Sequence, residues 1–139
     1  RFLELSGAAG GRWNMICELS ALWEGLLYDQ TALDAAWDLV KPWSAEERQG
    51  LRDGVPRLAL EAPFRDRTVQ QVARETLRIA RTGLRNRARV NSKSQDETVY
   101  LAPLEKIVSS GRTTADELLA RFNGPWHGNV DSVFELYAF

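Results

Sequence analysis

Apolar residues recur at three- and four-residue intervals along most of this chain, a pattern typical of amphipathic α-helices. The first such segment follows a glycine-rich breaker at 7–11 and predicts a helix over 14–28. A second helix is expected to begin at Asp29 or Thr31, either of which can cap it, and to end at Pro42. Its buried stripe would consist of Leu33, Ala36, Trp37 and Val40.

Two further helices are predicted in the middle of the chain. Ser44 and Glu47 have the spacing of a capping box, so a helix should begin there, and Pro56 should interrupt it. The segment 62–64 is expected to be a loop. The longest amphipathic pattern then predicts a helix over roughly 67–88.

Two shorter helices are expected near the end. The segment 99–108 should begin its helix at or near Pro103, because proline is tolerated in a first turn, and Gly111 should end it. Thr113 precedes two acidic residues and predicts a final helix to about Phe122.

The predicted architecture is mainly α: about six helices in one compact domain over 1–139, with the helical region at 12–139. A single strand at 1–6 comes before the helices. One short strand cannot form a sheet, so its partners would have to come from elsewhere.

Composition narrows the classes of function. With 139 residues and 44% hydrophobic residues the chain can bury one core. Its formal net charge of -1 does not favour nucleic acid as a partner, and no apolar run is long enough for a membrane span. The single cysteine, Cys17, excludes a disulfide within the chain and is compatible with a reducing cytoplasm.

Two polar features could bind a ligand, but a structural role is the better interpretation of each. Arginines recur along one face of the longest helix and could contact phosphates, although a solvated face is favoured. This series consists of Arg74, Arg78, Arg81 and Arg85. His127 is the only histidine and is expected to lie in a loop, and the five tryptophans are expected to fill core volume.

Two other residues are candidates for chemistry. Cys17 lies in the apolar first helix, where a small buried side chain is the default. Glu4 lies between Leu3 and Leu5 in the predicted strand, so its carboxylate would project alone to one face. A carboxylate in that position needs either solvent or a cation.

The order of motifs resembles the plant-type and proteobacterial glutamate-cysteine ligases. The chain reads R-F-L-E-L-S-G-A-A-G-G-R-W at 1–13, then Cys17, then G-L-L-Y-D at 25–29. The family segment reads approximately R-[FY]-L-E-M-R-G-A-D-G-G-P-W. The similarity covers effectively the whole chain, through motifs at 38–39, 43–48, 55–56, 62–65, 111–113, 123–126 and 132–134.

The resemblance implies an enzyme that uses ATP and Mg²⁺ to join the γ-carboxylate of glutamate to the amine of cysteine, the first step of glutathione synthesis. In that family the γ-carboxylate is phosphorylated first, and cysteine then displaces phosphate. The resemblance also implies a glutamine synthetase-like α+β parent, in whose antiparallel sheet the strand at 1–6 would lie. Glu4 matches a metal-binding glutamate of the family. Cys17 matches a cysteine associated with a redox-regulatory disulfide to an earlier part of the parent chain.

Three positions depart from the family pattern. Ser6 stands where the family has a functionally important arginine, Ala9 where it has aspartate, and Arg12 where it has proline. A hydroxyl cannot reproduce the charge and the two-pronged donor geometry of a guanidinium. Catalytic residues are therefore not assigned from the sequence.

We expect the chain to be the carboxy-terminal part of such a ligase, inactive alone, with the amino-terminal catalytic portion as its partner. Glutamate and cysteine would be the substrates of the parent enzyme. We expect no ATP or Mg²⁺ to be bound to this part alone, and the sequence leaves open whether the chain forms a homodimer. The alternative is a non-catalytic helical interaction module derived from the ligase framework. Nucleic-acid binding through the arginine series ranks last.

Overall fold

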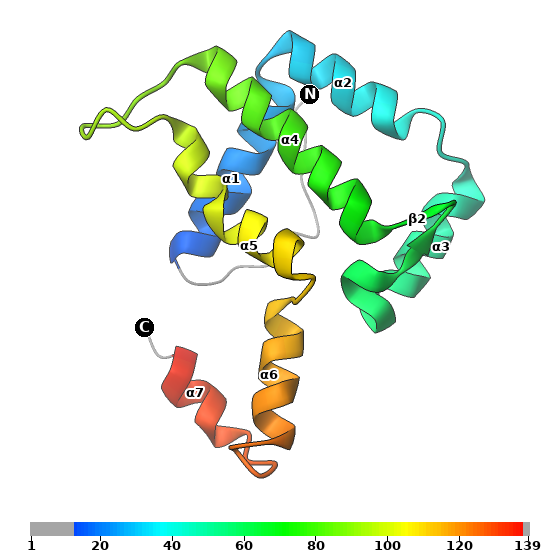
Figure 1. The fold of residues 1–139 in the computed structure, drawn as a ribbon, viewed down its shortest axis with the longest axis vertical. Helices are drawn as coiled ribbons and strands as arrows, with labels where there is room; N and C mark the ends of the chain where they lie inside the picture. The colour runs from blue at the N-terminus through cyan, green and yellow to red at the C-terminus, as the bar shows by residue number, and fades with distance from the viewer. Residues whose placement is uncertain (1–12, 138–139) are drawn as a thin grey trace, which may run out of the picture.

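Helices account for most of the chain, so the prediction of a mainly α fold is confirmed. The computed structural model describes residues 13–137, without the side chains of 13–15 and 137 (Figure 1). The strand expected at 1–6 lies outside the described residues. Seven α-helices occur in the described part, and their bounds are α1 Trp13–Leu27, α2 Gln30–Val40, α3 Ala45–Leu58, α4 Val69–Arg87, α5 Ala102–Ser110, α6 Thr114–Asn123 and α7 Asp131–Tyr137. Two 3-10 helices, η1 Ala59–Glu61 and η2 Glu97–Leu101, and a hairpin of β1 Pro63–Phe64 and β2 Arg67–Thr68 connect them.

The crossing of α1 and α4 forms the centre of the fold, and two glycines make it possible. A Cβ atom added at Gly25 would lie 2.3 Å from the carbonyl oxygen of Ala80. One added at Gly83 would lie 1.9 Å from the carbonyl oxygen of Gly25. Backbones approach this closely only where no side chain intervenes. The buried core around the crossing consists of Ala21, Leu26, Ala32, Leu77, Ile79, Ala80, Leu84, Leu101 and Val108.

Side-chain caps begin the helices where the sequence predicts them. The Asp29 carboxylate accepts a hydrogen bond from the Ala32 amide at 2.9 Å, so Asp29 rather than Thr31 caps α2. Ser44 and Glu47 form both halves of the capping box of α3. These local contacts satisfy amide groups that have no partner within the helix.

The ends of α5 and α6 also agree with the sequence. Pro103 lies in the first turn of α5, and Gly111 ends that helix with φ 72°, a left-handed conformation that glycine adopts without strain. Thr113 caps α6 and forms a capping box with Asp116. The predicted boundaries of these two helices are confirmed within two or three residues.

The prediction that Pro56 interrupts a helix is wrong. α3 continues to Leu58 with Pro56 in its last turn. Proline removes one hydrogen bond from the helix, but α3 has no fully buried residue, so water can reach the carbonyl that loses its partner.

The buried stripe predicted for α2 is also wrong in part. Trp37 is 62% exposed, and the buried residue of α2 is Ala32. The side chains of α2 that face the core are Ala32, Ala35, Ala36 and Leu39, a stripe one residue out of phase with the predicted one. Trp37 lies outside this stripe and does not fill core volume as expected. The other described tryptophans, Trp23, Trp43 and Trp126, are half-buried.

The expected loop at 62–64 is part of an antiparallel hairpin. Phe64 pairs with Arg67 across a turn in which Arg65 has a φ of 55°. Phe64 is buried, and its ring centroid lies 4.8 Å from that of Trp43. This aromatic contact joins the hairpin to the loop before α3.

The last two helices form an arm that extends away from the other helices (Figure 1). Within the arm Leu119 of α6 and Phe134 of α7 are exposed, Phe134 by 71%. The apolar side chains of Phe134 and Leu136 in α7 are thus exposed.

Candidate functional site

The residues that the ligase resemblance singles out fall into two groups. Glu4, Ser6, Ala9 and Arg12 lie outside the described residues, so the structure does not test their roles. Cys17 is described and lies in the second turn of α1.

Cys17 borders a hollow of about 260 Å³ between α1 and η2. The thiol is free and half-buried, so it is more accessible than the buried side chain expected from the sequence. Ser20, Glu24, Glu97 and Tyr100 line the same hollow. The fold thus brings a thiol next to two carboxylates that are distant from each other in the sequence.

Arg87 of α4 joins these two carboxylates. Its guanidinium donates a hydrogen bond to Glu24 and lies 3.6 Å from a carboxylate oxygen of Glu97. It also lies 5.5 Å from the ring centroid of Tyr28. The hydrogen bond to Glu24 is the main reason why the pKa of Arg87 is raised. This cluster connects α1, α4 and η2, and it offsets the negative charge beside Cys17.

Glu18, the neighbour of Cys17, was missed by sequence reasoning. The residue is 6% exposed, and its Oε2 atom has no hydrogen-bond partner among the described residues. Burial raises the pKa of this carboxyl above its usual range. The available signal was an acidic residue flanked on both sides by apolar residues, in the run at 15–19.

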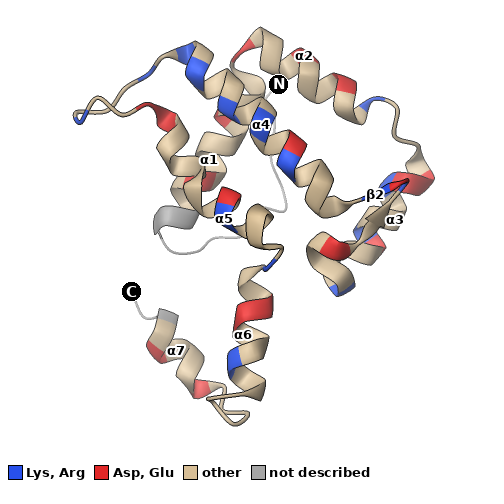
Figure 2. Ribbon diagram, viewed as in Figure 1, with Lys and Arg blue, Asp and Glu red and all other residues tan. Residues whose placement is uncertain are grey.

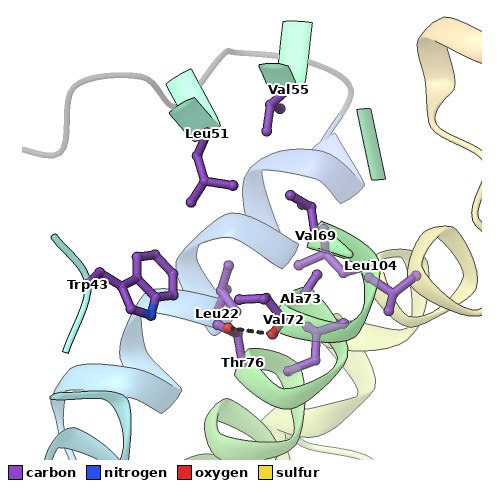
Figure 3. Close-up of a pocket in the computed structure, with 11 residues that line it drawn as sticks. Leu22, Trp43, Leu51, Val55, Val69, Val72, Ala73, Thr76 and Leu104 are labelled. Carbon is purple, nitrogen blue, oxygen red and sulfur yellow. Dashed lines mark hydrogen bonds between the residues drawn. The ribbon is translucent and has the colours of Figure 1, made fainter. Parts of the chain in front are cut away.

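A second candidate site is a groove between α3 and α4, called here the Trp43 groove (Figure 3). Its volume is about 320 Å³. Figure 3 shows Leu51 and Val55 of α3 facing Val69 and Val72 of α4 across the opening. The full lining is Leu22, Trp43, Leu51, Val55, Val69, Val72, Ala73, Thr76, Leu77, Leu104 and Val108.

Polar groups are scarce in the Trp43 groove. The Thr76 hydroxyl donates to the Val72 carbonyl oxygen at 3.0 Å and is therefore satisfied within α4. The Trp43 indole nitrogen is buried and has no acceptor among the described residues. A site with this lining favours apolar groups.

The arginine series of α4 is largely solvated, as predicted. Arg74, Arg78 and Arg85 are exposed, and Arg81 is hydrogen-bonded to Glu105 of α5. Figure 2 shows the basic residues spaced along α4.

His127 is exposed in the turn between α6 and α7 with a φ of 48°, so its predicted place in a loop is confirmed.

The described residues do not form a metal site. No group of three or more histidine, cysteine, aspartate or glutamate side chains within the described part could hold a metal ion. No helix in that part is long and apolar enough to cross a bilayer.

Comparison with known proteins identifies the class that the sequence motifs indicate. A family model described as glutamate-cysteine ligase family 2 (GCS2) matches residues 1–136, and the chain belongs to this family. Among its relatives is the chloroplastic glutamate-cysteine ligase of Arabidopsis thaliana, 42% identical over 135 residues, or 97% of this chain and 25% of that protein. The chloroplastic enzyme of Nicotiana tabacum is 40% identical over the same shares. Ligase A of Oryza sativa subsp. indica is 39% identical over 97% of this chain and 26% of its own length.

The chain therefore spans about a quarter of the length of the curated relatives that it matches. The family resemblance found in the motifs is confirmed.

Proposed function

We propose that this chain forms part of an ATP-dependent ligase that joins the γ-carboxylate of glutamate to the amine of cysteine. The observation that carries the proposal is the family match over residues 1–136, together with about 40% identity to proteins named for this reaction. Because the matched region is a quarter of those proteins, we assign to the chain one part of the enzyme. The partner in this proposal is the remaining portion of the ligase.

We propose that Glu4 takes part in the reaction directly, as one ligand of a Mg²⁺ ion that is held against the ATP phosphates. Mg²⁺ requires near-octahedral coordination by oxygen, so a single carboxylate cannot hold it. The described residues have no cluster that fits the ion. The other ligands would come from the remaining portion of the ligase, and the described helices would support the segment that contains Glu4.

We further propose that Cys17 is a redox-sensitive position. Its half-buried, free thiol in a solvent-connected hollow supports this role. With no second cysteine in the chain, the disulfide partner would belong to the remaining portion of the ligase. A reducing compartment such as the cytoplasm would keep the thiol free. The relatives named above are chloroplastic.

The test is a ligase assay in two settings. Formation of γ-glutamylcysteine from glutamate, cysteine and Mg-ATP is measured by mass spectrometry. The chain is assayed alone and after co-expression with Arabidopsis thaliana ligase that lacks its matched 135 residues. We expect product only from the co-expressed pair.

Glu4→Gln should lower the rate of the pair at least about a hundredfold, as expected for a lost ligand near transferring phosphate. The matched control is Glu61→Gln, which changes an exposed carboxylate of η1 in the same way and should leave the rate unchanged. Product from the chain alone, or full activity of the Glu4→Gln pair, would overturn this part of the proposal.

A catalytically inert interaction module is the second candidate, favoured by Ser6 and Ala9 at positions where the family has arginine and aspartate. It predicts that the pair assembles but forms no product at any Mg²⁺ concentration. Restoring the family residues with Ser6→Arg and Ala9→Asp distinguishes the two candidates. A large gain in rate would show that these two substitutions had removed the activity, whereas the ligase proposal expects substantial product without them.

A further inference from the structure

The Trp43 groove is lined almost entirely by apolar side chains. Its walls come from four helices, and Leu51 and Val55 of α3 stand at its rim, partly open to water. A concave apolar surface of this kind is suited to binding another segment or ligand. An occupant of the groove would contribute apolar side chains.

Trp43 stiffens one wall of the groove. Its ring lines the groove and contacts Phe64 of the hairpin, with the two ring centroids 4.8 Å apart. An occupant would therefore meet a fixed aromatic surface on this side.

Basic side chains border the groove on the α4 side. Leu77 and Val108 line both the groove and an adjoining hollow of about 240 Å³, which Arg74, Arg78 and Arg81 also line. Arg81 is hydrogen-bonded to Glu105, whereas Arg74 and Arg78 have no ion-pair partner among the described residues. We call Arg74 and Arg78 the arginine edge.

Several neighbouring arginines already have acidic partners. Arg65 binds Glu47, Arg67 binds Glu75, and Arg87 binds Glu24 and Glu97. The two unpaired guanidinium groups lie next to the apolar groove, so negative charge on the occupant would meet them. Charge complementarity of this kind fixes the orientation of a docked segment.

We propose that the Trp43 groove and the arginine edge dock an acidic amphipathic segment of the remaining portion of the ligase. Apolar side chains of that segment would fill the groove, and carboxylates would pair with Arg74 and Arg78. This inference rests on the proposed function, because the occupant belongs to the portion that makes up about three quarters of the matched relatives.

The experiment measures assembly rather than catalysis. The tagged chain is co-expressed with the Arabidopsis thaliana ligase that lacks its matched residues, and the amount of that protein recovered per tagged chain is quantified. Val55→Glu places a charge at the rim of the groove, where the native residue is 38% exposed and the substitution can be tolerated by the fold. Its control is Val90→Glu, at a residue 66% exposed and outside the groove.

The arginine edge is tested in the same way with the double substitution R74E/R78E. Arg85→Glu is the control, because Arg85 is an exposed arginine of the same helix that lines neither hollow. Thermal unfolding of each purified variant checks that the fold is retained. We expect Val55→Glu and R74E/R78E each to lower recovery at least about tenfold, with both controls close to the parent chain.

Recovery of the partner by Val55→Glu and R74E/R78E at the level of the parent chain would overturn the inference. So would failure of the parent chain to recover the partner. If the groove instead binds a second copy, tagged chain will recover untagged chain and Val55→Glu will abolish this, which also overturns it. An assembled pair without ligase activity would contradict the proposed function but not the docking inference. An active pair whose assembly is unaffected by all four variants would contradict the docking inference but not the proposed function.

Discussion

Replacing Gly83 by alanine should destabilise the chain, because the backbones of α1 and α4 touch at this residue. The new Cβ atom would lie 1.9 Å from the Gly25 carbonyl oxygen and 2.9 Å from the Ala32 Cβ. A carbon atom normally approaches an oxygen no closer than about 3.3 Å, so α1 and α4 must separate by more than about 1 Å. The fully buried Leu84 and Ala80 would then lose contacts on either side of the crossing.

The expected change follows from two opposing contributions. Overpacking of a close contact costs about 1–3 kcal/mol, with the upper part of the range expected where backbone atoms must move. The higher helix propensity of alanine returns at most about 1 kcal/mol. We therefore expect the free energy of unfolding to fall by about 2 kcal/mol, measured by urea denaturation followed by circular dichroism at unchanged m-value.

Gly50→Ala is the matched control, since it makes the same change in α3, where no atom lies within 4 Å of the added Cβ. That variant should gain about 0.5–1 kcal/mol. If Gly83→Ala were as stable as Gly50→Ala, the close approach of α1 and α4 would not exist in solution and the reasoning would be refuted.

Three further substitutions test local features. The hydrogen bond from Arg65, helped by the Ser44 amide, lowers the pKa of Glu47 from 4.5 to about 2. The ionised Glu47 carboxylate therefore stabilises the fold above pH 4.5, and this contribution is lost as the pH falls towards 2. The stability of Glu47→Gln, measured by thermal unfolding, should consequently decline less steeply over that range than the stability of the parent chain. For Glu18, whose pKa burial raises, ionisation destabilises the folded state as the pH rises above 4.5. Glu18→Gln should consequently unfold at a higher temperature at neutral pH, and an unchanged or lower temperature would contradict this. Thr113→Ala removes the cap of α6 and should cost about 1 kcal/mol locally, so hydrogen exchange of α6 amides should become about fivefold faster, while unchanged exchange would argue against the cap.

Much of the helical architecture could be predicted because its signals are local. The periodicity of α1 and α4, the caps at Asp29 and Ser44, and the glycine at 111 depend on contacts within a few residues. The burial of α2 depends on a different helix. The stripe that packs on the core consists of Ala32, Ala35, Ala36 and Leu39, one residue out of phase with the predicted stripe, and it leaves Trp37 exposed.

The candidate sites were less predictable for the same reason. Cys17 could be named from a motif, but its carboxylate neighbours Glu24 and Glu97 meet only because Arg87 joins three elements of the fold. The Trp43 groove arises from the angle between α3 and α4, which no sequence pattern specifies. Glu18 illustrates a signal that was present, since an acidic residue in an apolar segment is unusual, but its burial depends on packing.

The most direct test of the ligase proposal is a titration of this chain into the separately expressed Arabidopsis thaliana ligase that lacks its matched 135 residues. The initial rate of ATP-dependent γ-glutamylcysteine formation is followed as the chain concentration rises. We predict a rate near zero without the chain and saturation at one chain per partner molecule. A rate that stays at zero at saturating chain, with the complex present by gel filtration, would contradict the assignment of this chain to the working ligase.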